Sequence, residues 1–252
     1  MGLIGKLHMI HRCWRVRFLA EVSSIRYLRS LHLGGTTLLD IGARWGVYSI
    51  YMSRAAGKDG TVMAFEAQPE LGAHLESVKH AFDLKNLQII NLGLSSSIGT
   101  LTMHRSYVGF GGASFHLQGE IIEGMEELEI PVTTLDAVLV DHDDPISFIK
   151  CDVEDHELDV FLGAERTLKK HMPTLLFECV KAVAEKGEIF RYLVDLGYDG
   201  YFFHVTPEDH DTFLRRGRGH FIHYSEHANY PYCHPSVLHR NYFFVPQGTQ
   251  LA

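Results

Sequence analysis

Two carboxylates and two glycines mark the part of this 252-residue chain best suited to bind a cofactor. An apolar segment ends in Asp40, and Gly42 and Gly46 follow before a helix-like stretch begins. The next apolar segment ends in another acid, Glu66. A glycine-rich turn between a strand and a helix, with a carboxylate at the end of the next strand, is how an α/β sheet holds the nucleoside half of a cofactor.

The spacing of the glycines narrows the choice of cofactor. Dinucleotide-binding turns follow the pattern GxGxxG, which lets a pyrophosphate approach a helix N-terminus. Here the pattern is DxGxxxG, with Ala43, Arg44 and Trp45 between the glycines, and Asp40 would repel a phosphate but attract a cation. S-adenosylmethionine carries an ammonium and a sulfonium group and fits these demands better than NAD. The pattern predicts an S-adenosylmethionine site and disfavours an NAD(P)-dependent oxidoreductase.

Each residue of this pattern then has a predicted role toward the cofactor. Asp40 is expected under the amino-acid end, and the turn of Gly42, Ala43 and Gly46 lets the backbone approach the methionine and the ribose. Glu66 is expected to accept hydrogen bonds from both ribose hydroxyls, because a carboxylate offers two acceptor oxygens.

A third polar group lies in the segment CDVEDHELD, residues 151–159. Methyl transfer is an SN2 displacement, which needs an aligned nucleophile and, for a hydroxyl acceptor, a base. Asp152, at the end of the preceding apolar strand, is predicted to face the methyl group of the cofactor. Glu154 or His156 is predicted to be the base, because crowded carboxylates raise one another's pKa and a histidine titrates near neutrality.

The spacing of the acids and histidines predicts no metal site. Asp152 and Glu178, each near the end of an apolar strand, are the alternative, because their oxygens suit a divalent cation. His223 and His227 are four residues apart, like a metal pair, but no HExxH motif surrounds them. Aromatic residues near them favour packing or a substrate-facing wall instead.

The elements that position these residues alternate between strands and helices, which predicts a parallel sheet with crossover helices. Binding sites in such sheets lie outside the carboxyl ends of the strands, where Leu94 and Ser95 are expected to border the adenine. Helices are expected over 45–56, 70–82, 157–169 and 185–196. Strands are expected over 36–41, 61–66, 87–94, 147–153, 174–180, 198–205 and 240–246.

Two additions to this alternation are expected to shape the pocket. An insertion at about 96–134 contains the loop VGFGGASF and is interpreted either as a flap over the substrate or as a tight hairpin connection. A segment rich in histidine and aromatic residues follows at about 204–240. Its histidines are His204, His210, His220, His223, His227, His234 and His239.

Residues 1–35 are expected to form an N-terminal amphipathic helical extension, and residues 36–252 the cofactor-binding domain. Residues 1–33 contain six lysines and arginines against one acid, and their apolar residues recur at helical spacing. A helical cap packed on the edge of the domain is the favoured interpretation. An anionic membrane surface is the alternative partner.

Composition excludes several other classes. A formal net charge of −8 argues against a nucleic-acid partner, because such proteins carry a basic stripe. The four cysteines form no CxxC pair, so free thiols in a reducing cytoplasm are expected. No apolar run reaches the ~18 residues of a membrane-spanning helix.

Taken together, the motifs resemble the FkbM family of S-adenosylmethionine-dependent methyltransferases, from about Thr36 to about Phe203. The resemblance is carried by LLDIGARWGVYS, VMAFEAQPE, NLGLSSSIGTLTM, VTTLDAVL, FIKCDVEDHELDVFLGA and LLFEC. It implies the class I methyltransferase fold, a three-layer Rossmann-like sandwich with a mostly parallel seven-stranded sheet and an antiparallel last strand. It also implies methyl transfer, usually to oxygen, on a sugar, a glycan or another small molecule.

The resemblance also assigns a site role to Glu157 and exposes two departures. The family commonly has Asn where this chain has Arg44, and Gly where it has Asp155. A cation in the glycine turn opposes a cationic cofactor unless Arg44 points outward or pairs with an acid. A catalytically silent binding module of the same fold is therefore the alternative function.

Overall fold

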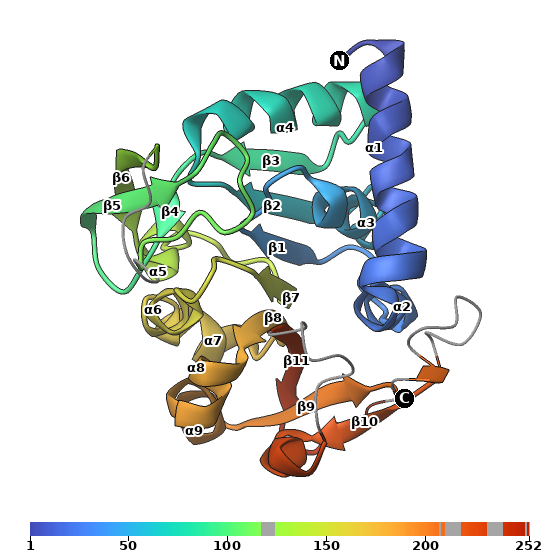
Figure 1. Ribbon diagram of the computed structural model, residues 1–252, viewed down its shortest axis with the longest axis vertical. Helices are drawn as coiled ribbons and strands as arrows, with labels where there is room; N and C mark the ends of the chain where they lie inside the picture. The colour runs from blue at the N-terminus through green and yellow to red at the C-terminus, as the bar shows by residue number, and fades with distance from the viewer. Residues whose placement is uncertain (117–123, 207, 210–217, 231–238, 250, 252) are drawn as a thin grey trace.

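Helices pack on both faces of a mixed β-sheet, so the chain forms three layers (Figure 1). The computed structural model describes residues 1–116, 124–206, 208–209, 218–230, 239–249 and 251. Within these residues the large sheet has eight strands in the order β10-β9-β11-β8-β7-β1-β2-β3. Their bounds are β1 (Thr37–Ile41), β2 (Thr61–Phe65), β3 (Leu87–Ile90), β7 (Ile146–Cys151), β8 (Thr174–Val180), β9 (Tyr198–His204), β10 (His220–His223) and β11 (His239–Pro246).

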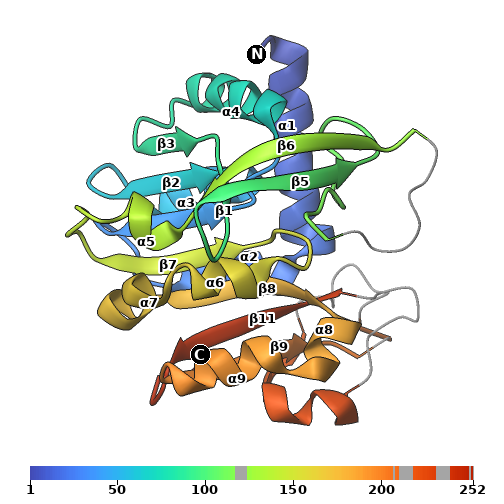
Figure 2. The same cartoon turned by 90° about the vertical axis from the view of Figure 1, so that its left-hand side faces the viewer.

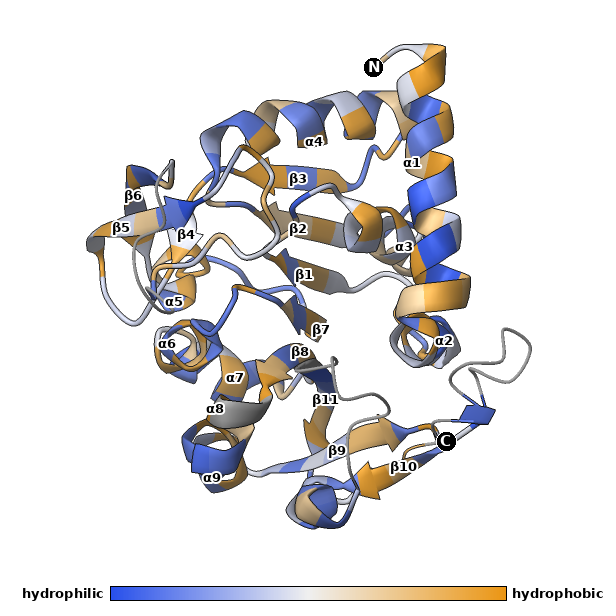
Figure 3. Ribbon diagram, viewed as in Figure 1, coloured by the Kyte–Doolittle hydropathy of each residue, from blue (hydrophilic) through white to orange (hydrophobic). Residues whose placement is uncertain are grey.

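The central strands of this sheet are parallel and buried on both faces. Strands β3, β2, β1, β7 and β8 run parallel to one another, whereas β11 runs antiparallel to its neighbours β8 and β9. Every residue of β1 is buried, and Figure 3 shows the central strands mostly in apolar colours. Apolar runs of this kind are expected where helices cover both faces of a parallel sheet. The predicted α/β fold with an antiparallel last strand is confirmed.

The sequence predicted seven strands, and the eighth is β10 at the edge of the sheet. It pairs antiparallel with β9, and the Phe221 ring lies 5.3 Å from that of Phe203 and 5.1 Å from that of Phe243. These aromatic contacts hold β10 against the sheet. The sequence did not predict this strand because it has four residues, two of them histidines, and so shows no clear apolar pattern.

Two apolar cores lie between the sheet and its helices. Met9, Ile25, Met52 and Leu75, from α1 to α4, belong to the core on one face. The other core receives side chains from α5, α6, α7, α8 and α9, with Phe190 of α9 among them. The helices are α1 (Leu3–Arg15), α2 (Val22–Ser30), α3 (Val47–Ala56), α4 (Pro69–Phe82), α5 (Leu135–Val138), α6 (Glu157–Leu162), α7 (Glu165–His171), α8 (Lys181–Lys186) and α9 (Glu188–Asp195).

Glycines break two helices that were predicted as continuous. The helix expected over 157–169 stops before Gly163, where an added Cβ would lie 2.1 Å from the carbonyl oxygen of Ser95. The helix expected over 185–196 is divided at Gly187, which has φ +68°. The first break brings the α6–α7 junction directly against the segment that follows β4 (Gly93–Leu94).

The predicted strand over 87–94 divides into β3 and β4, because the chain turns at Asn91. The side-chain Nδ2 of Asn91 donates hydrogen bonds to the carbonyl oxygens of Glu66 at 2.6 Å and of Gln68 at 3.2 Å. Strand β4 joins a second, three-stranded sheet in the order β4-β6-β5, with β5 (Gly99–Arg105) and β6 (Glu126–Thr133). Figure 2 shows β5 and β6 lying across the β1–β2 part of the large sheet.

The N-terminal segment is helical, as predicted, and consists of α1, a π-helical turn (Val16–Ala20) and α2. Met9 is buried in the core on this face, and the hydroxyl of Tyr51 on α3 donates to the carbonyl oxygen of Cys13 at 3.0 Å. No described helix combines the length and the apolar character needed to cross a bilayer.

The C-terminal histidines have separate partners where the structure describes them. His223 Nε2 lies 2.9 Å from Asp199 Oδ1, and His227 Nδ1 lies 3.0 Å from the carbonyl oxygen of Tyr224. The two therefore do not converge on a common point. His210, His234 and the cysteine at 233 lie outside the described residues, as does much of the 204–240 segment.

Candidate active site

Two cavities lie at the carboxyl ends of β1, β2 and β7, where the sequence placed the binding site. The first has a volume of about 80 Å³ and is lined by Glu66 and Leu94 among others. The second has a volume of about 130 Å³ and is lined by Asp40. Gly42, Arg44 and Asp152 line both. The β1–α3 turn therefore separates two compartments of one site.

Asp40 is fully buried, yet one of its oxygens has no partner. Its Oδ2 accepts a hydrogen bond from Ser49 Oγ on α3 at 2.5 Å, while Oδ1 has none within the protein. Burial raises the pKa of this carboxyl, and the positive charge of Lys150 opposes the rise. A buried acceptor without a partner costs free energy, about 1–3 kcal/mol, so Oδ1 is a place where a ligand donor would be stabilised.

The glycine turn is built for close approach of backbone atoms. Gly42 has φ +76°, and an added Cβ would lie 1.9 Å from the carbonyl oxygen of Asp152. Gly46 has φ +78° and precedes the first residue of α3, and a Cβ there would lie 2.9 Å from Leu75. Ala43, between them, is buried and donates its N–H to Phe65 O at 2.9 Å. Only glycine fits position 42 without moving the β7 loop.

Glu66 is buried at the end of β2, and backbone donors hold its carboxylate. The N–H of Arg44 donates to Oε2 at 2.6 Å, and that of Gln68 donates to Oε1 at 2.8 Å. Burial raises the pKa of Glu66, and these two hydrogen bonds oppose the rise. Each oxygen keeps one further lone pair, so the carboxylate can still accept two hydrogen bonds from a ligand in the first cavity.

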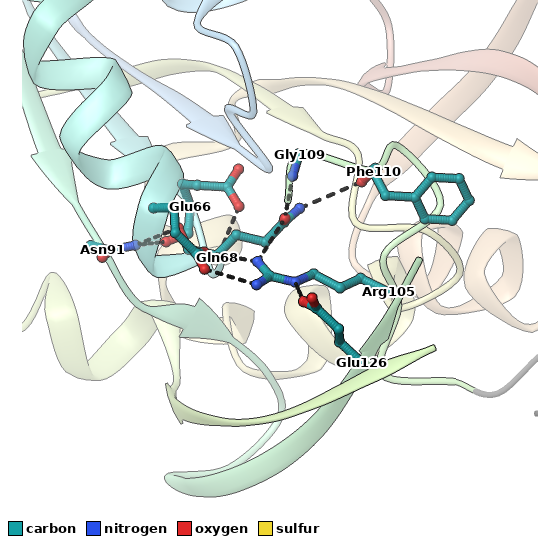
Figure 4. A network of polar contacts seen from close by, with 8 residues as sticks. Glu66, Gln68, Asn91, Arg105, Gly109, Phe110 and Glu126 are labelled. Atoms are coloured by element: carbon teal, nitrogen blue, oxygen red, sulfur yellow. Dashed lines mark hydrogen bonds and ion pairs between the residues drawn. The ribbon is translucent and has the colours of Figure 1, made fainter. Parts of the chain in front are cut away.

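The insertion covers the first cavity and is tied to the sheet through Gln68 (Figure 4). Gln68 Oε1 accepts hydrogen bonds from the N–H of Gly109 at 2.8 Å and from Arg105 Nη1 at 3.3 Å. Arg105 pairs with Glu126 Oε2 at 2.8 Å. Phe110 follows in the same loop and lines the cavity. The insertion thus contains an antiparallel hairpin of β5 and β6, but the connection between them, residues 106–125, is not the tight one that was the alternative to a flap, and part of it lines the first cavity.

Arg44 points at this cover. Its Nε and Nη2 donate to the carbonyl oxygen of Gly109 at 3.3 and 3.2 Å, and an added Cβ on Gly111 would lie 2.6 Å from its guanidinium. The cation expected to oppose the cofactor therefore fastens the loop at 109–111.

Leu94 and Ser95, predicted to border the adenine, have different surroundings. Leu94 lines the first cavity beside Phe115 and Met103. Ser95 is buried but is absent from the lining of that cavity, and its Oγ lies 3.0 Å from His156 Nε2. The sequence pattern could not show that Leu94, the last residue of β4, lines the cavity, whereas Ser95, which follows β4, contacts His156 instead.

The second cavity contains charged residues that sequence reasoning missed. Lys150 is buried, and its Nζ lies 2.7 Å from Asp152 Oδ2 and 5.1 Å from the centre of the Tyr48 ring. Glu21, from the N-terminal segment, accepts hydrogen bonds from the Tyr48 hydroxyl and from Asn241. Burial lowers the pKa of Lys150, but the carboxylates of Asp152, Asp40 and Glu21 raise it by more than burial lowers it. The amine of Lys150 therefore remains charged. Two sequence features could have pointed to these residues. Lys150 is a charged residue inside an apolar strand, and Glu21 is the one acid in the basic segment 1–33.

Five acids gather around a small cavity of about 10 Å³ that shares two of them with the first compartment: Asp152, Glu154, Asp155, Glu157 and Glu178. Burial raises the pKa of Glu154 to about 7, and Asp152 adds to the rise. Burial also raises the pKa of Glu157 to about 8, although its Oε1 accepts a hydrogen bond from Val153 N at 2.9 Å. The predicted crowding of carboxylates is present in the structure. Of these acids, Asp152 and Glu154 also line the first cavity.

His156, the other predicted base, is enclosed. It is 4% exposed, and its Nε2 and Nδ1 lie 3.0 Å from Ser95 Oγ and from His116 Nε2, respectively. Burial lowers the pKa of His156 to about 4. It lines neither of the two compartments. The metal pair Asp152–Glu178 stays a prediction, with Asp152 Oδ2 held by Lys150.

The raised pKa of Glu178 predicts how stability depends on pH. Burial, and then the charges of Asp152, Glu21 and Glu154, raise its pKa to about 8. Because the folded state keeps a proton that the unfolded state loses near pH 4.5, stability falls as pH rises from about 4.5 to about 8. We expect the melting temperature in EDTA to fall between pH 6.5 and 8.5, and to fall less in Glu178→Gln. An equal slope in both proteins would exclude this origin.

Both departures from the FkbM pattern lie at positive φ. Arg44 has φ +47° and Asp155 has φ +72°, a region that costs non-glycine residues about 1–2 kcal/mol. Glycine and asparagine, the residues common in the family, tolerate this region best. The structure therefore explains the family pattern through backbone conformation.

Asp155→Gly should accordingly stabilise the protein. Relief of about 1 kcal/mol of strain corresponds to a rise in melting temperature of about 2–4 °C for a domain of this size. Differential scanning calorimetry at pH 7 measures the shift. Asp141→Gly is the control, because Asp141 is exposed and lies outside the positive-φ residues of the described chain, so glycine there should not stabilise. An unchanged melting temperature in Asp155→Gly would contradict the strain at this position.

The strand order, the glycine turn and the acids at adjacent strand ends define a class I methyltransferase fold of the Rossmann-like type. Residues 40–200, more than half of the chain, match the model of the methyltransferase FkbM domain. The chain therefore belongs to the FkbM family of methyltransferases. A search of curated proteins finds no match.

Solved structures show the same fold. The FkbM methyltransferase of Methylobacillus flagellatus KT superposes with a TM-score of 0.55 at 15% identity, over 90% of this chain and 46% of that one. This chain thus spans about half the length of that protein. An rRNA methylase from Streptococcus thermophilus gives a TM-score of 0.50 at 10% identity, over 88% of this chain and 93% of that one.

Proposed function

We propose that this methyltransferase transfers a methyl group to a hydroxyl of a small molecule, such as a sugar, a glycan or a secondary metabolite. The observation that carries the proposal is a pair of half-buried acids, Asp152 and Glu154, that line the first compartment. Oxygen acceptors need a base, and acids of this kind supply one. The net charge of −8 disfavours a nucleic-acid acceptor, and the free thiols of Cys13, Cys151 and Cys179 support a cytoplasmic location.

The residues of both compartments fit S-adenosylmethionine. The orphaned Oδ1 of Asp40 suits a cationic donor, and Lys150 suits a carboxylate, so the second cavity matches the amino-acid end. Gly42 lets the β1–α3 turn lie directly against the backbone of Asp152, and both residues line the two compartments. The spare lone pairs of Glu66 suit two ribose hydroxyls, and Leu94 with Phe110 offers apolar walls for an adenine.

The protein's part in the reaction is to align, exclude water and remove a proton. When bound, S-adenosylmethionine supplies an electrophilic methyl group that an oxygen nucleophile attacks in line. Lys150 holds Asp152 at the junction of the compartments, which fixes a carboxylate beside the reacting centre. Glu154, with a pKa of about 7, accepts the proton of the attacking hydroxyl. The loop at 109–111, held by Arg44 and Gln68, keeps water out of the first compartment.

Titration calorimetry with S-adenosylhomocysteine, first in EDTA and then with Mg²⁺, tests the cofactor site. We expect micromolar binding in both buffers, followed by methyl transfer from radiolabelled S-adenosylmethionine to a member of a panel of sugars and phenols. A gain in affinity with Mg²⁺ would assign Asp152 and Glu178 to a metal. Absence of binding in both buffers would favour the silent module. Binding with no transfer to any hydroxyl compound would contradict the proposed acceptor class.

Asp40→Asn tests the amino-acid end. Removing the charge of a hydrogen-bonded carboxylate costs about 1.5–3 kcal/mol, so S-adenosylhomocysteine affinity should fall by roughly 10- to 150-fold. Ser49→Ala is the matched control, because it removes the internal partner of Asp40 and leaves the ligand-facing oxygen. Equal affinities in wild type and Asp40→Asn would remove Asp40 from the site.

A further inference from the structure

Three potential metal ligands converge beside the cofactor site. The atoms His116 Nε2, His156 Nδ1 and Asp159 Oδ2 lie within 4.8 Å of one another, the only such group of three or more in the part of the chain that the structure describes. His116 belongs to the insertion, whereas His156 and Asp159 lie at the start of α6. The three side chains thus come from two segments about forty residues apart.

Their spacing suits a tetrahedral ion. The two histidine nitrogens are 3.0 Å apart, and Asp159 Oδ2 lies 3.5 Å from His156 Nδ1 and 3.9 Å from His116 Nε2. Bonds of about 2.0–2.1 Å to zinc in a tetrahedron require ligand atoms separated by about 3.3–3.4 Å. The three distances bracket this value. An ion at their centre therefore requires only small side-chain movements.

The other polar atom of each of the two α6 ligands already has a partner. Ser95 Oγ lies 3.0 Å from His156 Nε2, the ring nitrogen that faces away from the group. Ser96 Oγ donates to Asp159 Oδ1 at 3.0 Å and leaves Oδ2 for the ion. Hydrogen bonds of this kind fix the orientation of metal-binding histidines and carboxylates. Two neighbouring serines thus hold the ligands in the orientation that a metal needs.

We propose that His116, His156 and Asp159 bind one divalent transition-metal ion, for which Zn²⁺ has the matching ligand set and geometry. The ion fastens the insertion to the start of α6, since it joins a residue of each. Ser114 Oγ, which donates to the carbonyl oxygen of Glu154 at 2.6 Å, already joins the same two segments. Phe115, between Ser114 and His116, lines the first cofactor compartment, so the ion also fixes one wall of that compartment.

Metal titration of the full chain after dialysis against EDTA tests the site. We expect wild type to bind one more equivalent of Zn²⁺ tightly than His116→Ala, and to give a tetrahedral Co²⁺ absorption spectrum that His116→Ala lacks. The difference between the two proteins is the readout, because the 15 histidines of the chain other than His116 and His156 also offer nitrogen ligands to Zn²⁺. His116 has a half-exposed side chain, so its removal should leave the fold intact by circular dichroism.

Two further variants separate a built site from chance binding. Ser96→Ala should weaken Zn²⁺ binding by about 10–100-fold, the usual effect of losing a hydrogen bond to a metal ligand. His80→Ala is the control, since His80 is an exposed histidine 4.0 Å from a carboxylate oxygen of Glu76 and should not change the stoichiometry. Identical titrations of wild type and His116→Ala would overturn the proposal. The test needs no S-adenosylmethionine, so its outcome is independent of methyl transfer.

A separate observation concerns the outer face of α1. Leu3, Ile4, Leu7, Ile10 and Trp14, followed by Phe18, are between 36% and 75% exposed. They recur at three- and four-residue steps, and the buried Met9 lies on the opposite side of the helix. Figure 3 shows apolar and polar residues alternating along α1. The helix therefore packs on the domain by one face and presents an apolar stripe to solvent on another.

We infer that this stripe docks on an anionic membrane surface. On the helical wheel Lys6 and Arg17 flank one side of the stripe and Arg15 the other, which is the arrangement of helices that lie in a lipid interface. The alternative occupant is a second copy of the chain. Two such copies would bring together segments with six basic residues and one acid each, and the like charges would repel.

Co-sedimentation with vesicles of phosphatidylcholine and phosphatidylglycerol tests this surface. We expect binding that weakens with added salt and is lost on pure phosphatidylcholine. Leu7→Glu should weaken binding about tenfold or more, because it removes a leucine that the lipid would bury. Ile98→Glu changes an exposed apolar residue elsewhere on the surface and should not weaken binding. Absence of sedimentation, or a dimer in ultracentrifugation that Leu7→Glu dissociates, would overturn the inference.

Discussion

Replacing Gly42 with alanine is expected to weaken S-adenosylhomocysteine binding by about 100-fold, the upper end of the ~1–3 kcal/mol that overpacking costs. The added methyl group would lie 1.9 Å from the carbonyl oxygen of Asp152, a backbone atom that cannot rotate away. Relief requires β1 and the loop after β7 to separate. That movement displaces Gly42 and Asp152, and both residues line the two compartments.

Gly57→Ala provides the matched control for this variant. Gly57 has φ +68°, close to the +76° of Gly42, but an added Cβ there meets nothing within 4 Å. Both variants therefore place an alanine at positive φ, where side chains are strained, and only Gly42→Ala has the clash. Calorimetry should show normal affinity in Gly57→Ala, although both variants lose melting temperature from strain. Equal affinity in the two variants would show that the close contact between Gly42 and Asp152 is not part of the cofactor site.

The sequence was most informative where one residue's type determines its role. Asp40, Gly42 and Glu66 follow from strand ends and a glycine turn, because a parallel sheet brings the carboxyl ends of its strands to one edge. The three-layer fold follows from the alternation of strands and helices in the same way. These features depend on local pattern plus one topological rule.

The rest depends on contacts between distant segments, which one sequence does not show. Glu21 reaches the second compartment because α2 packs beside α3, and Arg44 turns toward the insertion because the carbonyl oxygen of Gly109 accepts hydrogen bonds from its guanidinium. His116 meets His156 across forty residues of chain. Backbone strain at Asp155 was equally hidden, although the family's glycine at that position was a signal of positive φ.

Glu154→Gln is expected to lower the rate of methyl transfer by about 10²–10⁴-fold, the usual contribution of a general base. Glu154 lines the first compartment with Asp152, and its φ of +54° is a left-handed backbone conformation that non-glycine residues rarely adopt. Strain of this kind persists where surrounding structure enforces it, often at functional sites. The rate is measured with radiolabelled cofactor and the hydroxyl acceptor found by screening. Cofactor affinity should change little, because glutamine keeps the shape of the side chain.

The pH profile distinguishes a base from a residue that only shapes the pocket. Because burial raises the pKa of Glu154 to about 7, its carboxylate form increases as pH rises through 7, and the wild-type rate should rise with it to a plateau. Glu154→Gln should lose this step. Glu157→Gln should keep it, since the Glu157 carboxylate is engaged with Val153 N and glutamine still accepts that hydrogen bond. A step near pH 7 that survives in Glu154→Gln would show that another group is the base.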